Sequence, residues 1–144
     1  IALYNLWNNF PEQRIAYLEK SKKWMGFNDY NLRTLWLTLA LSTPNYAIDK
    51  VALANELIPY SSINYEANTR QNALEKLLAF KIINDRVLEN LVQATTHHMW
   101  QFTKFGRDNI RKLLKNPEMR VSLERILPNL NEAEQFQLNR LLKE

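Results

Sequence analysis

The only two histidines of the chain are adjacent, as His97 and His98. Zinc peptidases place two histidines four residues apart in the pattern H-E-x-x-H, so that both rings reach one metal ion from the same face of a helix. Adjacent side chains on a helix point about 100° apart and cannot share one ion in this way. We therefore predict no metal site in this chain and assign both histidines to packing or to a helix end.

Other reactive groups are equally scarce. The sequence has no cysteine, and its two glycines, Gly26 and Gly106, stand alone, so neither a thiolate site nor a glycine-rich phosphate loop is encoded. No serine stands in the G-x-S-x-G pattern of a nucleophile elbow. For this chain alone we predict no catalytic residue, no cofactor-binding residue and no metal ligand.

Positive charge gathers in one stretch, and the net charge of the chain is +4. The cations of this basic stretch are Lys104, Arg107, Arg111, Lys112, Lys115, Arg120 and Arg125. Those at positions 104, 107, 111 and 115 would line one face of a helix, where they could follow a phosphate backbone. However, no RNA-binding or helix-turn-helix signature accompanies them, and a charged helix face is usually solvated. Nucleic-acid binding is therefore the least favoured hypothesis.

Two further groups of residues are assigned to structure. Arg33 lies in the most apolar segment, where an unpaired guanidinium is costly, and Asp29 has the spacing for an ion pair with it. The aromatic residues recur at helical spacing, which favours packing over a ligand groove. The tryptophans concerned are Trp7, Trp24, Trp36 and Trp100.

These residues must be positioned by helices, because apolar residues recur at intervals of three, four and seven and no segment alternates as a strand does. We predict an all-α fold of about eight helices. Short connections make consecutive helices antiparallel, so the expected architecture is a right-handed stack of antiparallel helix pairs, a HEAT-like superhelix. The 144 residues are predicted to form one domain, 1–144.

Three of the seven predicted helix starts combine a capping side chain with proline or with a capping box, and the others offer one of these signals alone. The predicted starts are Pro11, Asn28 or Asp29, Thr43-Pro44, Ser61 or Ser62, Asn84 and Asp85, Asn116-Pro117, and Asn131 with Glu134. Gly26 is predicted to end one helix. The β-branched pair Thr95 and Thr96, followed by His97, predicts a break between two others.

Composition limits the class of protein. Hydrophobic residues make up 46% and charged residues 24%, as in ordinary globular domains. The longest nearly apolar run, residues 35–41, is far shorter than the ~20 residues of a membrane span. The sequence begins at Ile1, and we expect it to be a piece of a longer chain. Its composition leaves the compartment open.

Residues 26–40 read Gly-Phe-Asn-Asp-Tyr-Asn-Leu-Arg-Thr-Leu-Trp-Leu-Thr-Leu-Ala. This run resembles the C-terminal helical domain of the aminopeptidase N and leukotriene hydrolase family of zinc metallopeptidases, in which a Phe-Asn turn leads into a helix of the form Asn-x-x-Ile-Arg-x-x-Trp-Leu-x-Leu. The residues in similar places are Asn28, Arg33, Trp36, Leu37 and Leu39. The segment 65–78 and the break at Thr96-His97 extend the resemblance over about residues 11–115.

The resemblance implies a non-catalytic module. In this family the zinc ion and its ligands belong to a separate catalytic domain of the parent chain, and the helical domain packs on it and shapes peptide access. Some members present a cation to the peptide carboxylate through a motif similar to Gly-Arg-Met-Lys, where this chain has Tyr65-Glu66-Ala67-Asn68. Arg70 is the nearest cation, and the resemblance makes it the candidate contact for the substrate carboxylate.

The sequence leaves three functional hypotheses. The first is the C-terminal helical domain of a zinc aminopeptidase, whose partners are its own catalytic domain and the peptide substrate. The second is a free-standing helical-repeat scaffold that binds another protein. The third is a basic helical module that binds nucleic acid. An H-E-x-x-H motif in the complete parent reading frame would separate the first from the others.

Overall fold

The computed structural model describes residues 2–22 and 30–144, and in these ranges it contains nine α-helices, three short 3-10 helices and no strand. The all-α prediction is confirmed, with one helix more than the rough count from the sequence. Several predictions fall outside the described residues: the cap at Gly26, the helix start at Asn28 or Asp29, and the packing of Trp24. Among the described residues, no helix is long and apolar enough to cross a membrane.

The helices group into two compact units, residues 1–59 and residues 60–144. The first unit contains α1 (Ala2–Asn9), the 3-10 helix η1 (Pro11–Gln13), α2 (Arg14–Lys22), α3 (Tyr30–Ser42) and α4 (Lys50–Leu57). The 3-10 helix η2 (Ile58–Ser61) spans the boundary. A single domain over residues 1–144 and a right-handed superhelix stay predictions.

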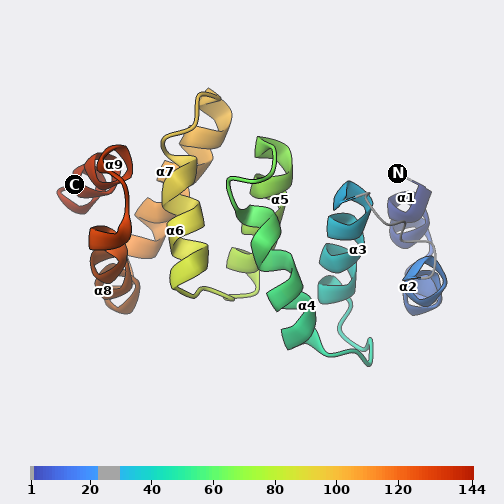
Figure 1. The fold of residues 1–144 in the computed structure, drawn as a ribbon. Coiled ribbons are helices and arrows are strands. Elements are labelled where there is room, and N and C mark those ends of the chain that lie inside the picture. Colours follow the sequence, from blue (N-terminus) through green and yellow to red (C-terminus); the bar gives the residue numbers. More distant parts are fainter. Residues whose placement is uncertain (1, 23–29) are drawn as a thin grey trace. The chain divides into compact units, whose positions relative to one another are not determined.

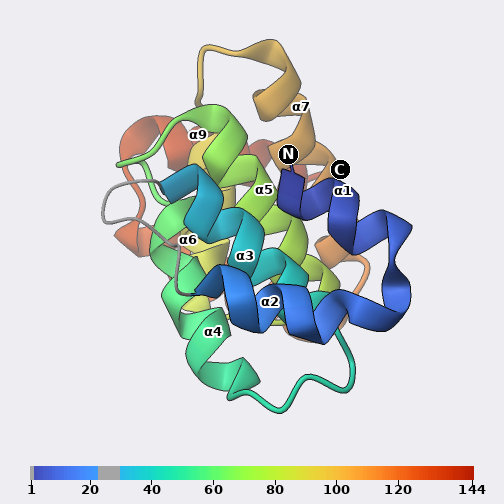
Figure 2. The same cartoon turned by 90° about the vertical axis from the view of Figure 1, so that its right-hand side faces the viewer.

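The core of the first unit forms where α2 lies across α3 (Figure 2). Trp36 is fully buried there, and its Nε1 donates a hydrogen bond of 2.9 Å to the carbonyl oxygen of Leu18. The hydroxyl of Tyr46 donates to the carboxylate of Glu19, and burial together with this carboxylate raises the pKa of Tyr46. The predicted packing role of Trp36 is therefore confirmed.

The second unit contains α5 (Ala67–Ala79), α6 (Asp85–Ala94), α7 (Trp100–Leu114), α8 (Pro117–Ile126), the 3-10 helix η3 (Leu127–Asn129) and α9 (Glu132–Leu142). Helices α6 and α7 pack against each other in the middle of this unit, with α5 on one side and α8 and α9 on the other (Figure 1). Gly106 makes the close approach of α6 and α7 possible, because a Cβ atom there would stand 3.1 Å from Ala94 Cβ and 3.3 Å from the carbonyl oxygen of Leu91.

Three predicted helix starts of the second unit are confirmed by their hydrogen bonds. Asn84 accepts from the backbone N–H of Val87 at 2.9 Å and caps α6, and Asn116 accepts from Glu118 and caps α8. Asn131 and Glu134 form the reciprocal capping box of α9. The break at residues 95–97 is also confirmed, since α6 ends at Ala94.

The prediction that Thr43-Pro44 starts a helix is wrong. Thr43 is buried, and its hydroxyl donates backwards to the carbonyl oxygen of Leu39 at 2.8 Å instead of capping a helix after it. Lys50 Nζ also donates to the carbonyl oxygens of Ala40 and Thr43, so the end of α3 is satisfied from outside the helix. The next helix, α4, begins at Lys50 because Asp49 caps it.

The prediction that Ser61 or Ser62 caps α5 is also wrong. Both serines are buried, and the N-cap position is held by Glu66, whose side chain makes no capping bond. Ser61 instead accepts a hydrogen bond of 2.8 Å from Nδ2 of the fully buried Asn90 on α6. Its hydroxyl is therefore used in packing rather than in starting a helix.

Candidate functional site

Arg70 stands in the first turns of α5, on the face that points into the second unit. Ala73, Leu74 and Leu77 on the same helix are fully buried, and Arg70 itself is only 4% exposed. Its backbone N–H donates to the carbonyl oxygen of Glu66 at 3.0 Å, as helix geometry requires. The helical period thus places a charged side chain on the buried face of α5.

The guanidinium of Arg70 has no hydrogen-bond partner for its buried Nε and Nη2 atoms in the part of the chain that the structure describes. Its Cζ atom lies 4.8 Å from the centre of the Phe102 ring on α7, which is a cation–π contact. Burial lowers the pKa of Arg70 from its usual value. A buried cation facing an aromatic ring without a carboxylate is electrostatically incomplete.

The turn between α6 and α7 brings His97 next to this arginine. The His97 ring stacks on His98 at a centroid distance of 4.2 Å and meets the edge of Phe102 at 5.2 Å. The backbone N–H of Met99 donates to His97 Nδ1 at 3.0 Å, so the neutral ring carries its proton on Nε2. We call these four residues, Arg70, His97, His98 and Phe102, the Arg70 cluster.

The Arg70 cluster disfavours a further positive charge. The pKa of His97 is lowered by burial first, and then by the proximity of His98 and Arg70. Burial is thus the main reason why a proton on His97 is disfavoured, and the neighbouring His98 and Arg70 act in the same direction. An anion in contact with the guanidinium would balance its charge, but the buried Nε and Nη2 atoms are closed to solvent in this structure.

Large apolar side chains are exposed directly beside the cluster. Met99 is 41% exposed and Trp100 is 66% exposed, at the start of α7. The predicted packing role of Trp100 is therefore wrong within this chain: as the first residue of α7, it precedes the inward face on which Phe102 is buried. Tryptophan is among the residue types most enriched in the strong contacts of protein interfaces.

The structure brings no three metal-ligating side chains together among the residues that it describes. His97 and His98 stack on each other and take part in the turn. The zinc ion that the resemblance implies for a parent protein therefore has no set of ligands within this part of the chain, and no step of chemistry is assigned to one here.

The basic stretch is partly neutralised by its own chain. Lys104 and Asp108 form an ion pair at 2.6 Å, and Arg111 pairs with Asp108 at 3.3 Å and with Glu144 at 2.8 Å. Arg125 pairs with Asp85 on α6 at 2.6 Å. The helical face that sequence spacing offered to a phosphate backbone is therefore crossed by carboxylates, which weakens the nucleic-acid hypothesis.

Arg33 is paired, as predicted, but with a residue that the sequence did not indicate. Its Nε and Nη2 donate to the two carboxylate oxygens of Glu56 on α4 at 2.6 and 2.7 Å. Asp29, the predicted partner, lies outside the described residues. Arg33 and Glu56 are 23 positions apart and form a bidentate ion pair. No short-range spacing in the sequence indicates such a pair, so only the packing of the helices shows it.

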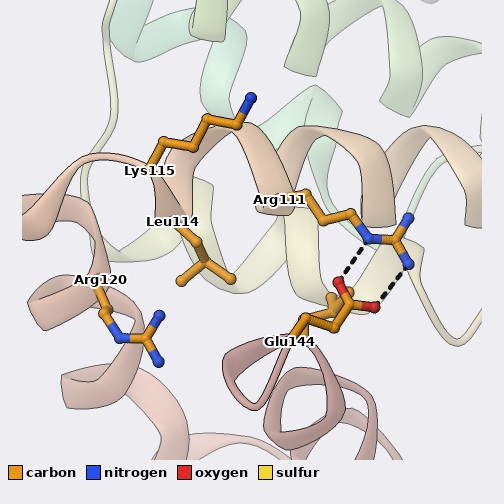
Figure 3. Close-up of a pocket in the computed structure, with 6 residues that line it drawn as sticks. Arg111, Leu114, Lys115, Arg120 and Glu144 are labelled. Carbon is orange, nitrogen blue, oxygen red and sulfur yellow. Dashed lines mark hydrogen bonds and ion pairs between the residues drawn. The ribbon is translucent and has the colours of Figure 1, made fainter.

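A second concave site was not anticipated by the sequence. A cavity of about 290 Å³ lies among α7, α8 and the end of α9, and its lining includes three cations and one carboxylate (Figure 3). The lining residues are Arg111, Leu114, Lys115, Arg120, Leu141 and Glu144. The basic stretch pointed to three of them, but not to their arrangement around a cavity.

Comparison with known proteins adds no family assignment. No protein-family model, curated protein or solved structure matches the chain. The resemblance to the zinc aminopeptidases therefore depends on the residues of the chain itself, chiefly those of segment 26–40.

Proposed function

We propose that this chain is a non-catalytic helical domain of a zinc aminopeptidase, which packs on a separate catalytic domain and helps to shape peptide access. The residue pattern of segment 26–40 and the all-α fold support this proposal. The exposed Met99 and Trp100 offer an apolar surface for a neighbouring domain. Zinc and the hydrolytic chemistry belong to the parent's other domain.

The observation that carries the proposal is the incomplete environment of Arg70. Folding buries this guanidinium to 4% exposure and leaves two of its nitrogens without partners in the described residues. A neutral side chain of similar length would fit this core at lower cost, so the cation is best explained by an anion that it meets during function. In the proposed function this anion is the carboxylate of a peptide.

The first test is the complete reading frame that encodes this chain. The proposal requires an H-E-x-x-H motif in the same polypeptide, and zinc-dependent release of N-terminal residues by the purified parent. A parent without this motif would overturn the proposal. The test is independent of how Arg70 behaves.

The role of Arg70 is tested in the full-length parent with Arg70→Met. We expect KM for a peptide with a free carboxylate to rise at least about tenfold, because a hydrogen bond to a charged group contributes ~1.5–3 kcal/mol. KM for the corresponding peptide amide should not change. Arg86→Met on α6, whose side chain is exposed, is the matched control. Equal KM values for wild type and Arg70→Met would remove the substrate role of Arg70.

A second candidate function, a free-standing scaffold that binds a protein, is favoured by one observation only. Trp100 is 66% exposed, and tryptophan is among the residue types most enriched in the strong contacts of protein interfaces. This hypothesis predicts a parent without the zinc motif and a defined complex whose affinity falls at least about tenfold in Trp100→Ala. Unchanged affinity in that variant would exclude this surface.

A further inference from the structure

The cavity of the second unit is built where three helices end or begin. The last turns of α7 supply Arg111 and Leu114, and Lys115 follows as the C-cap residue. Arg120 comes from α8, and Leu141 and Glu144 come from the end of α9 and the residues after it. The apolar floor and the charged rim thus come from elements that pack together around one space (Figure 3).

One carboxylate already occupies the cationic rim. Arg111 Nε donates to Glu144 Oε2 at 2.8 Å and its Nη2 donates to Glu144 Oε1 at 3.0 Å, a two-pronged contact drawn in Figure 3. This contact lowers the pKa of Glu144 and raises the pKa of Arg111. The chain itself therefore shows which chemistry fits Arg111: a planar group with two anionic oxygens.

A second guanidinium faces the cavity from the other side of Leu114 (Figure 3). Arg120 Nη2 donates to the carbonyl oxygen of Leu142 at 2.6 Å, and this bond fixes the side chain against the end of α9. The carboxylate of Glu124, paired with it, is 3.5 Å from Nε and lies on the same helix, outside the cavity lining. Arg120 is therefore held in place while keeping donors for another anion.

Lys115 adds charge to the lining from a more flexible side chain. Figure 3 shows its ammonium pointing away from Arg120 and Glu144. A flexible lysine can turn towards a bound anion as a point charge. The lining then holds three cations, Arg111, Lys115 and Arg120, against one carboxylate, Glu144.

We propose that this cavity binds a small organic anion with carboxylate or phosphate groups, and that Glu144 is an internal occupant which the ligand displaces from Arg111. One anionic group takes the place of the Glu144 carboxylate, a second group meets Arg120, and the carbon chain between them lies on Leu114 and Leu141. The cavity volume of about 290 Å³ fits one small molecule and is at the lower end of ligand pockets.

Displacement of Glu144 is physically easy. The side chains of Arg111 and Glu144 are 44% and 51% exposed, and ion pairs with this exposure contribute little to stability. Glu144 follows the last helical residue, Leu142, by two positions, so its carboxylate can leave Arg111 by a rotation of the side chain, without unwinding α9. The site is thus closed by a weak contact that a stronger anion replaces.

The test is a titration of the ¹⁵N-labelled chain with citrate and with inorganic pyrophosphate, at low and at moderate salt. We expect amide shifts at residues 111–115, 120 and 141–144. Arg120→Ala should weaken binding several-fold, because a contact between an anion and a cation that is 42% exposed contributes up to about 1 kcal/mol. Glu144→Gln should strengthen binding several-fold, because it removes the competing carboxylate. The control Arg125→Ala removes a cation of the same stretch that pairs with Asp85 outside the cavity, and should bind normally.

Several results would overturn the proposal. The first is an equal loss of affinity in Arg120→Ala and Arg125→Ala. The second is a set of amide chemical-shift changes spread along the whole basic stretch. The third is weaker binding by Glu144→Gln than by the wild type. An acidic hexapeptide is titrated in parallel, and tighter binding of this peptide than of both small anions would assign the cavity to a protein partner instead. Arg120→Lys, which keeps the charge and the fold but loses the fork, should weaken binding less than Arg120→Ala. Equal weakening by both variants would remove the role of charge at this position.

Discussion

Replacing Arg70 by methionine should stabilise the second unit, although it changes a buried residue. Methionine has a similar length and no group that needs a hydrogen bond, so it removes the unpartnered Nε and Nη2 from the core. The usual outcome of a core substitution is destabilisation. An increase in the free energy of unfolding would show that the buried guanidinium destabilises the free chain.

The magnitude follows from the contacts of the side chain. Each unsatisfied buried polar group costs about 1–3 kcal/mol, so two nitrogens cost about 2–6 kcal/mol. The cation–π contact of Arg70 with Phe102 stabilises the wild type by about 1–2 kcal/mol, and this contact is lost in the variant. The difference between these two terms is about 0–5 kcal/mol, and we expect Arg70→Met to raise the free energy of unfolding by about 2 kcal/mol.

The assay must report on the second unit alone, because the chain divides into two compact units and a single unfolding transition cannot be assumed for both. Of the four tryptophans, only Trp100 lies within residues 60–144. Urea unfolding of the 5-fluorotryptophan-labelled chain, followed by ¹⁹F NMR at the Trp100 resonance, therefore isolates this unit. Trp100→Phe assigns the resonance, and Arg86→Met is the surface control with an expected change within about 0.5 kcal/mol.

An unchanged or lower free energy of unfolding in Arg70→Met would refute the reasoning. It would mean that the guanidinium is satisfied in the free chain and needs no external anion. A gain in stability together with loss of peptide binding by the parent would instead identify Arg70 as a residue that serves binding at the expense of folding.

Three further predictions concern local features of the second unit. Gly106→Ala should lower the free energy of unfolding by about 1 kcal/mol, although alanine has the better helix propensity. The added Cβ atom would stand 3.1–3.3 Å from atoms of Ala94, Thr95 and Leu91, and this overpacking outweighs the gain in propensity. Urea unfolding measures the change, and a stabilised variant would contradict the close approach of α6 and α7. Lys81→Gly should raise the free energy of unfolding by up to about 1 kcal/mol, because Lys81 follows α5 with a φ of 57°, a left-handed conformation that glycine adopts without strain. A decrease of the same size in urea unfolding would show that the lysine side chain contributes more than the backbone strain costs. Acidification from about pH 7 to 5 should destabilise the chain, because the pKa of His97 is lower in the folded chain and the unfolded chain therefore binds the proton more readily. In thermal melts, the stability of His97→Gln should depend less on pH than that of the wild type. The same pH dependence in both proteins would contradict this role of His97.

Local signals predicted the helices well where a side chain within three residues satisfies the helix end. Asn84, Asn116 and the Asn131–Glu134 pair cap α6, α8 and α9 as their spacing indicated. The same logic failed at Thr43, whose hydroxyl had a competing acceptor one turn back, the carbonyl oxygen of Leu39. A hydroxyl can bond in either direction along the chain, and the surrounding packing decides which.

The candidate site could be predicted only in part. Arg70 was selected through a family resemblance, and its burial against Phe102 depends on how α5 packs against α7. The cavity joins Arg111 to Glu144 across 33 positions, and Arg120 to Leu142 across 22. No short-range spacing encodes such contacts, so the basic stretch identified the cations without their partners.

The sequence by itself determined that this protein is helical, where α6, α8 and α9 begin, and that it lacks the local patterns of a catalytic site. These properties depend on neighbours within one or two helical turns, whose geometry is set by the backbone. The tertiary structure alone decided which charges are paired, which are buried, and which large apolar side chains remain exposed. Those outcomes depend on contacts between helices, where a rotation of one residue, about 100°, moves a side chain from the core to the surface.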